Sequence, residues 1–176
     1  MYAVRIHGRG GQGVVTCAEL LAVAAFLEGR YAQAFPSFGS ERTGAPVAAF
    51  CRIDDRPIRT HEPIAEPDAV VVADPSVMYQ VDVLAGLKPD GHLLVNTGRP
   101  LSTVDGACLV PATELAREYV GKPLPNAALL GAFAALTGWV SLNSVLAAIR
   151  QRFATPVAER NVEAARAAYG KVPTHA

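Results

Sequence analysis

The stretch Gly8-Arg9-Gly10-Gly11-Gln12-Gly13 decides the fold. It matches the pattern G-x-G-x-x-G, follows a short β-prone segment at residues 2–7 and opens an apolar segment at residues 12–27 that is predicted to be helical. The glycines let the backbone turn tightly and approach a ligand, and the helix N-terminus presents free N–H groups to an anion. The stretch therefore predicts the first strand–turn–helix unit of an α/β protein, with a ligand crevice beside it.

The rest of the chain continues this alternation. Further strands are expected at residues 30–35, 47–53, 69–73, 92–96 and 108–110, and further helices at 76–84, 113–120, 126–137, 142–152 and 157–169. Residues 54–59 are interpreted as the turn and returning arm of a β-hairpin. Gly29 is expected to end the first helix, and Ser141 and Thr155 to cap two later ones. The expected fold is α/β: a single Rossmann-like domain over residues 1–176, with a mostly parallel sheet, an antiparallel hairpin and a helical C-terminal third.

Composition narrows the class of protein. The chain has 176 residues, enough for one domain, of which 51% are hydrophobic and only 18% are charged. Such an apolar chain is not intrinsically disordered, and its excess of apolar residues suggests a surface covered by partner chains. Sixteen basic residues balance sixteen acidic ones, so no basic nucleic-acid footprint is present.

The cysteines and the apolar runs also limit the metal sites and the cellular locations that are expected for this chain. Cys17, Cys51 and Cys108 are far apart and form no C-x-x-C motif, so neither a metal site nor an iron–sulfur cluster is expected within this chain. Their odd number, without a leader peptide, suggests reduced thiols and a cytoplasmic location. The longest apolar run, residues 14–27, contains Thr16 and Glu19 and is too short to cross a membrane.

A second candidate segment follows the predicted strand at residues 30–35. It is a polar, glycine-containing loop at residues 36–46, and loops of more than about ten residues without regular structure are often functional. Arg42 could hold a phosphate or carboxylate through two hydrogen bonds, or it could merely pair with Glu41 at the surface. The candidate binding residues of this segment are Ser37, Phe38, Gly39, Ser40, Glu41 and Arg42.

The third candidate segment follows the predicted strand at residues 92–96. Asn96 and Thr97 could hydrogen-bond a ligand, or they could equally cap the turn that they begin. Because the carboxyl ends of parallel strands share one edge of a sheet, all three segments are expected to lie at the same edge.

Several signals of a self-contained enzyme are lacking. A dinucleotide-binding unit needs an acidic residue about 20 residues after its glycines, but residues 33–35 are Gln, Ala and Phe, and Glu28 comes too early. No Gly-Asp-Gly thiamine motif is present, because Pro89 stands where its first Gly would be. His7, near the glycine turn, is interpreted as a structural residue. The turn could therefore be purely structural, or it could bind a phosphorylated ligand or a partner chain.

Together these segments resemble the gamma subunit of the pyruvate (or ketoisovalerate):ferredoxin oxidoreductases. The resemblance extends from residue 4 to about residue 170, and the stretch from Ser37 to Arg42 is its most specific part. Thr43 departs from it, since many relatives carry a second Arg there. Other matching stretches are residues 8–13, 33–36, 44–47, 52–54, 57–59 and 67–76.

The resemblance implies an accessory subunit of an enzyme that oxidatively decarboxylates a 2-oxo acid to acyl-CoA and carbon dioxide and passes the electrons to ferredoxin. Thiamine diphosphate, Mg and 4Fe-4S clusters would reside in alpha, beta and delta-type partner subunits, and this chain alone would bind no cofactor and be inactive. The three candidate segments would face coenzyme A and the thiamine site. Two alternatives stay open: a stand-alone dinucleotide-binding oxidoreductase, and a purely structural scaffold subunit.

Overall fold

The computed structural model describes residues 1–37 and 42–173. Its sheet has six strands in the order β2-β3-β1-β4-β5-β6. The strands are β1 (Tyr2–Arg9), β2 (Tyr31–Pro36), β3 (Pro46–Asp54), β4 (Ala69–Val72), β5 (His92–Asn96) and β6 (Cys108–Val110). The helices are α1 (Val14–Leu27), the short 3-10 helix η1 (Pro75–Tyr79), α2 (Ala112–Tyr119), α3 (Asn126–Thr137), α4 (Leu142–Arg152) and α5 (Val157–Lys171).

The sheet combines parallel and antiparallel pairing. β1, β4, β5 and β6 pair in parallel, whereas β3 runs antiparallel to both β1 and β2. β4 is buried throughout, as expected for a strand covered on both faces. The mixed α/β fold with a mostly parallel sheet and a helical C-terminal third is therefore confirmed.

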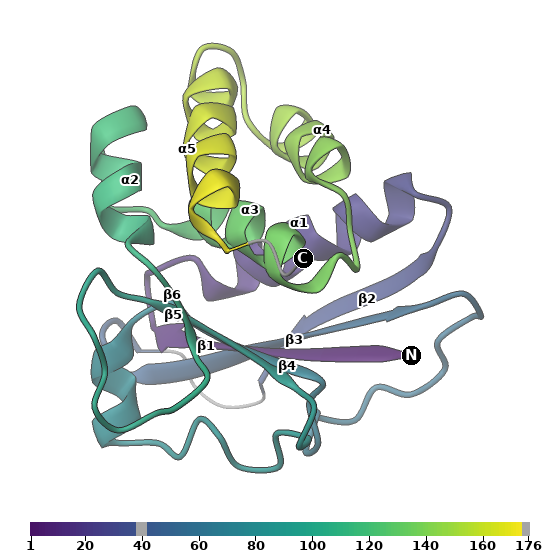
Figure 1. The fold of residues 1–176 in the computed structure, drawn as a ribbon. Coiled ribbons are helices and arrows are strands. Elements are labelled where there is room, and N and C mark those ends of the chain that lie inside the picture. The colour runs from purple at the N-terminus through teal and green to yellow at the C-terminus, as the bar shows by residue number, and fades with distance from the viewer. Residues whose placement is uncertain (38–41, 174–176) are drawn as a thin grey trace.

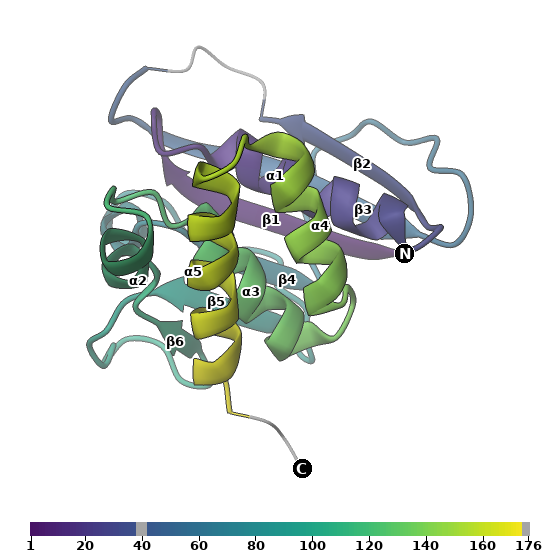
Figure 2. The ribbon, with the colours of Figure 1, turned by 90° about the horizontal axis from the view of Figure 1, so that it is seen from above.

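The two faces of the sheet are covered differently. The helices α1 to α5 lie over one face, as Figures 1 and 2 show from two directions. Within this layer α1 and α3 are alanine-rich and pack closely, and a Cβ on Gly131 of α3 would overlap the carbonyl oxygen of Ala165 in α5. The opposite face is covered by η1 and long connections, where Val77 packs beside Val70, Val72 and Val95.

The hairpin prediction for residues 54–59 was wrong. The antiparallel partner of β3 that follows α1 is β2, and residues 55–68 contain no strand. Side chains hold this connection instead of a ladder: Gln33 Nε2 donates to the carbonyl of Thr60, and Arg5 Nη1 donates to that of Ile64. Pro57, Pro63 and Pro67 have no N–H group, so the connection cannot donate to a strand ladder at these positions.

The predicted helix at residues 76–84 was also wrong, because only η1 forms there. Asp74 caps η1 by accepting a hydrogen bond from the Ser76 N–H at 2.9 Å. Asp82 then accepts from the Leu84 N–H at 3.1 Å, and such side-chain bonds to the backbone compete with helix continuation.

The helix ends agree in part with the prediction. Gly29 follows the end of α1 with φ of 79°, and Ser141 caps α4 by accepting from the Ser144 N–H. Thr155 does not cap α5, which begins after Pro156 without a side-chain cap. Among the described residues, no helix combines the length and the apolar character that crossing a bilayer requires.

Candidate functional site: the glycine turn and the carboxyl edge of the sheet

The glycine turn lies directly against the described part of the second segment. The Gly10 N–H donates to the carbonyl of Ala45 at 2.8 Å, and the Gly44 N–H donates to the carbonyl of Gly10 at 3.0 Å. A Cβ on Gly10 would overlap the carbonyl oxygen of Arg42, so only glycine permits this approach. The structure thus brings residues 8–13 and 42–45 together at one edge of the sheet.

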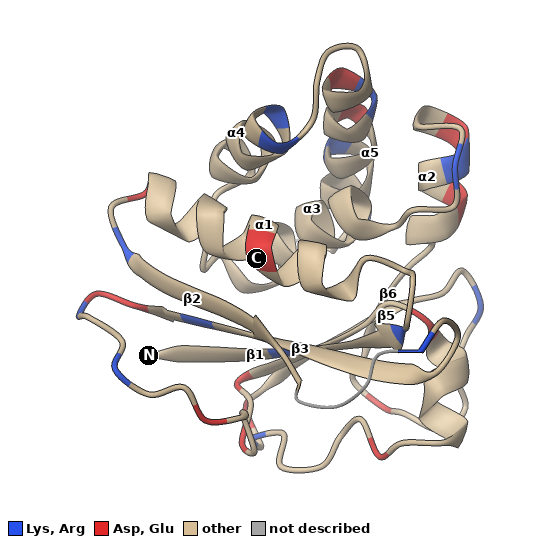
Figure 3. Cartoon of the chain, turned by 180° about the vertical axis from the view of Figure 1, so that it is seen from behind, with Lys and Arg blue, Asp and Glu red and all other residues tan. Residues whose placement is uncertain are grey.

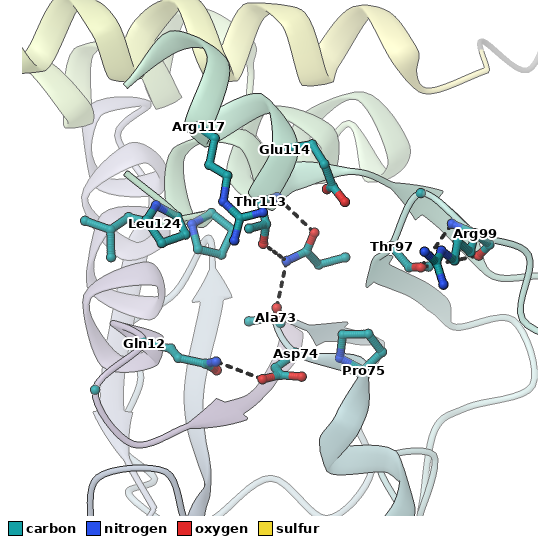
Figure 4. Close-up of a pocket in the computed structure, with 15 residues that line it drawn as sticks. Gln12, Ala73, Asp74, Pro75, Thr97, Arg99, Thr113, Glu114, Arg117 and Leu124 are labelled. Carbon is teal, nitrogen blue, oxygen red and sulfur yellow. Dashed lines mark hydrogen bonds between the residues drawn. The ribbon is translucent and has the colours of Figure 1, made fainter. Parts of the chain in front are cut away.

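Gln12 fixes the conformation of the turn from within. Its Oε1 accepts from the Arg9 N–H at 2.7 Å, and its Nε2 donates to Asp74 Oδ2 at 2.8 Å. The amide therefore joins the end of β1 to the segment after β4, with its donor and acceptor sides both used. Figure 4 shows the Gln12 side chain pointing at Asp74 across the floor of a pocket.

Asp74 is the charged centre of this network. Arg9 Nε lies 3.7 Å from Asp74 Oδ2 and donates to Ser76 Oγ at 2.9 Å. Burial alone would raise the pKa of Asp74, but hydrogen bonds from Ser76 and Gln12 and the charge of Arg9 together hold that pKa below its ordinary value. The carboxylate therefore stays ionised and orders the loop.

These residues form the floor of a cavity of about 660 Å³, which we call the edge pocket. It opens at the carboxyl ends of β1, β4 and β5, where ligands of open α/β sheets bind. Its wall on the helix side comes from α2 and the connection to α3, and Arg117 of α2 lies above the floor (Figure 4). The pocket is lined by Gly11, Gln12, Ala73, Asp74, Pro75, Asn96, Thr97, Gly98, Arg99, Thr113, Glu114, Arg117, Pro123, Leu124 and Pro125.

Asn96 and Thr97 line the edge pocket, but their side chains are already engaged. Asn96 Nδ2 donates to the Ala73 carbonyl and to Thr113 Oγ1, both at 2.8 Å, and its Oδ1 accepts from the Thr113 N–H at 3.1 Å. Thr97 Oγ1 accepts from the Arg99 N–H at 3.1 Å. Asn96 therefore ties β5 to β4 and to α2, and Thr97 caps the turn that follows β5. The contact of these two residues with a ligand stays a prediction.

The second segment is described only in part. Ser37 continues the sheet pairing through its N–H, which donates to the Ala48 carbonyl at 2.9 Å, and Arg42 is exposed beside the glycine turn. Phe38, Gly39, Ser40 and Glu41 lie outside the described residues, so their predicted role stays a prediction. No cluster of three or more potential metal ligands occurs among the residues that are described.

Thr113 and Arg117 are pocket residues that the sequence reasoning missed, whereas Arg99 belongs to the third candidate segment, which the sequence placed at this edge. Thr113 and Arg117 belong to the first two turns of α2, which directly follows β6. Because β6 is parallel to β5, a helix that begins at its carboxyl end must start at the same edge as the glycine turn. That placement was the available signal for Thr113 and Arg117.

The topology counts against the dinucleotide alternative. In that fold the strand after the glycine turn and its helix returns parallel to the first strand and beside it. Here α1 leads to β2, and the antiparallel β3 lies between β2 and β1. The helix after the turn therefore does not complete the usual βαβ unit.

His7 is a structural residue, as the sequence suggested. It is buried, and its Nε2 accepts from Arg5 Nε at 2.9 Å. Burial, helped by the Arg5 charge, lowers the pKa of His7 to about 4. Arg5 in turn donates to carbonyls of Ile64 and Val83, so this neutral histidine helps to hold the connections beneath the sheet.

The fold and the edge pocket together define a mixed α/β protein with a glycine turn, a half-buried aspartate network and two arginines around a pocket at the carboxyl edge of its sheet. A family model described as pyruvate ferredoxin/flavodoxin oxidoreductase matches residues 3–171. The chain belongs to this family, and within it to the gamma-subunit type.

Individual relatives agree with this assignment. The common gamma subunit of the pyruvate/ketoisovalerate oxidoreductases of Pyrococcus abyssi is 51% identical over 179 residues, which cover 97% of either chain. The pyruvate synthase subunit PorC of Methanothermobacter marburgensis is 49% identical over 173 residues, or 98% of each chain. The crystal structure of the pyruvate oxidoreductase subunit PORC of Thermotoga maritima superposes with a TM-score of 0.86 at 37% identity, over 98% of this chain and 97% of that one.

Proposed function

We propose that this chain is the gamma subunit of a multisubunit 2-oxoacid:ferredoxin oxidoreductase, in which it covers the thiamine site and helps to bind coenzyme A. The complex would convert a 2-oxo acid and coenzyme A to acyl-CoA and carbon dioxide and would pass two electrons to ferredoxin. Thiamine diphosphate, Mg and 4Fe-4S clusters would belong to alpha, beta and delta-type partners. The chain itself would be inactive alone, would bind neither nucleic acid nor a membrane, and would act in the cytoplasm.

The edge pocket is the observation that carries this proposal. Coenzyme A is an anion with a long, flexible amide arm, and the pocket offers it two cations, Arg99 and Arg117, beside an exposed glycine backbone at Gly11. Of the two acidic residues in the lining, Asp74 is offset by Arg9, and Glu114 lies on α2. A volume of about 660 Å³ suits a part of the coenzyme rather than the whole. The rest of the binding surface would come from the partner subunits.

The chain's own residues would act by position and by exclusion of water. Thiamine diphosphate, bound by the partner subunits, would supply the electron-accepting chemistry for the decarboxylation. The Gln12–Asp74 network keeps the glycine turn rigid, so that its backbone meets the ligand without reorganising. A cover over the pocket would keep water from the reactive centre until coenzyme A arrives.

Steady-state kinetics of the assembled complex test the proposal. Arg117→Ala and Arg42→Ala are expected to raise the KM for coenzyme A roughly three- to tenfold, since each removes one charge-assisted contact. The KM for the 2-oxo acid and the kcat should stay unchanged. Arg56→Ala is the matched control, because Arg56 is exposed in the connection after β3, at the opposite edge of the sheet.

Two outcomes would contradict the proposal. If the complex assembles normally and neither variant changes the KM for coenzyme A, the chain is a scaffold subunit. If the isolated chain oxidises a substrate with NAD(H) or NADP(H), the stand-alone dinucleotide alternative is correct.

A further inference from the structure

A second cavity, of about 450 Å³, lies on the other side of the glycine turn, and we call it the rear pocket. Three separate parts of the chain enclose it: the beginning of α1, the connection from α2 to α3, and the connection from α4 to α5. It shares Gly11 and Leu124 with the edge pocket and has otherwise its own lining. The rear pocket is therefore a distinct site that borders on the first.

All the charged residues that line the rear pocket are basic. Lys122, Arg152 and Arg160 line it, and no acidic residue does. None of these three has a carboxylate partner among the described residues, whereas Arg150, in the same helix as Arg152, pairs with Glu159 at 2.8 Å. Figure 3 shows basic positions gathered at the end of α4. Three unneutralised cations around one cavity favour an anionic occupant.

A buried polar atom in the same cavity also lacks a partner. Asn126 Oδ1 is buried and accepts no hydrogen bond from any residue that the structure describes. Its amide nitrogen lies so close to Gly13 that a Cβ there would be 2.6 Å away, which fixes the side chain against the turn. Because a buried acceptor without a donor costs free energy, the occupant is expected to supply a donor.

The remaining lining is apolar and suits a ring. Val120, Leu124, Phe153 and Val157 form this part of the wall. The beginning of α1 adds to the attraction for an anion, because its N-cap, Gly13, offers no side-chain cap and its first turn has no acidic residue. An occupant must thus combine negative charge, a hydrogen-bond donor and a flat apolar part.

We propose that the rear pocket binds the phosphate groups of a purine nucleotide, with the cations on the phosphates and an amino or hydroxyl group of the nucleoside on Asn126 Oδ1. Two sources share this chemistry: the nucleotide half of coenzyme A, and a free nucleotide that would act as an effector. The inference goes beyond the proposed function. Only the assignment to the nucleotide half of coenzyme A rests on that function.

Titration calorimetry on the full chain tests the inference with three probes: adenosine 3′,5′-bisphosphate, ADP and inorganic pyrophosphate. At least one nucleotide should bind, and its affinity should fall as salt is raised. Arg152→Gln and Arg160→Gln should each weaken binding roughly five- to tenfold. Arg166→Gln, an exposed change further along α5, is the control and should have no effect.

The outcomes separate the two sources and the two proposals. Tighter binding of adenosine 3′,5′-bisphosphate assigns the pocket to the coenzyme, and equal or tighter binding of ADP assigns it to a free nucleotide. Asn126→Ala should weaken the nucleotides but not pyrophosphate. The inference is wrong if no nucleotide binds, if pyrophosphate binds as tightly as both nucleotides, or if Arg166→Gln weakens binding as much as Arg160→Gln. A failure of the proposed function would instead appear as an unchanged KM for coenzyme A in Arg117→Ala and Arg42→Ala.

Discussion

Gln12 shows how a single side chain sets the shape of the glycine turn. An amide is required there because one end must accept from the Arg9 N–H and the other must donate to Asp74. A glutamate has almost the same shape but cannot donate when it is ionised. The identity of this residue is thus dictated by the network and not by the glycine pattern around it.

Gln12→Glu is therefore expected to destabilise the protein. It would place a second carboxylate in contact with Asp74, and we expect the free energy of unfolding to fall by roughly 1–3 kcal/mol at pH 7. Urea unfolding measures this change. Adding Asp74→Asn to the variant restores a donor–acceptor pair and should recover part of the loss; a double variant no better than the sum of its single changes would contradict the network.

His7 gives the protein a defined response to acid. Its pKa lies near 6.5 in the unfolded chain and at about 4 in the folded one, so the unfolded state binds the extra proton first as the pH falls. The contribution of His7 to the free energy of unfolding is complete above pH 6.5. It is lost as the pH falls from 6.5 to about 4, by up to about 1.4 kcal/mol per pH unit.

Urea unfolding at pH 7 and pH 5 tests this response. His7→Asn should flatten the dependence of stability on pH, although the variant itself is less stable. The wild-type protein, unfolded under the same conditions, provides the reference slope. An unchanged slope in His7→Asn would show that the histidine is not the group that titrates.

At the scale of the elements, close packing of α3 on α5 depends on a missing side chain. Gly131→Ala should lower the free energy of unfolding by roughly 1–3 kcal/mol, because the new methyl group meets the backbone carbonyl of Ala165. Gly170→Ala is the matched change in a helix with open space around it, and it should stabilise by up to about 0.5 kcal/mol. Chemical denaturation measures both, and a neutral Gly131→Ala would contradict the close contact.

The elements also show what a sequence can predict. β5, α3 and α4 lie at the residues expected, because each has a local signal. The signals are a buried apolar run in β5, a segment rich in alanine and leucine in α3, and the Ser141 cap in α4. The connections beneath the sheet were predicted wrongly, because they are held by distant partners. Arg5 Nη2, for example, donates to the carbonyls of Val83 and Ala85, about 80 positions along the chain.

The residues of the candidate site also differ in whether the sequence could predict them. The glycine turn was visible in a contiguous motif, and its approach to residues 42–45 follows from the shared edge of the sheet. Arg117 and the three cations of the rear pocket are single residues on different helices, and only the packing of those helices brings them to a cavity. All four are solvent-exposed, and nothing local in the sequence distinguishes them from basic residues that line no cavity.

For the whole molecule, the helices protect one face of the sheet, while the site lies at an edge where exposed apolar residues also occur. Tyr79 of η1 is 93% exposed at this edge, and Val81 and Leu84 follow it. An exposed aromatic residue beside a ligand pocket is typical of a subunit interface. This agrees with the proposal that the chain is one subunit of a larger complex.

Hydrogen–deuterium exchange of the assembled complex, with and without coenzyme A, tests the central claim most directly. We predict that coenzyme A slows exchange in peptides covering residues 8–16 and 96–99, at the carboxyl edge of the sheet, and leaves residues 54–66 at the opposite edge unchanged. Unchanged exchange in both of the first two peptides, at a concentration of coenzyme A that saturates turnover, would show that the glycine turn does not meet the coenzyme.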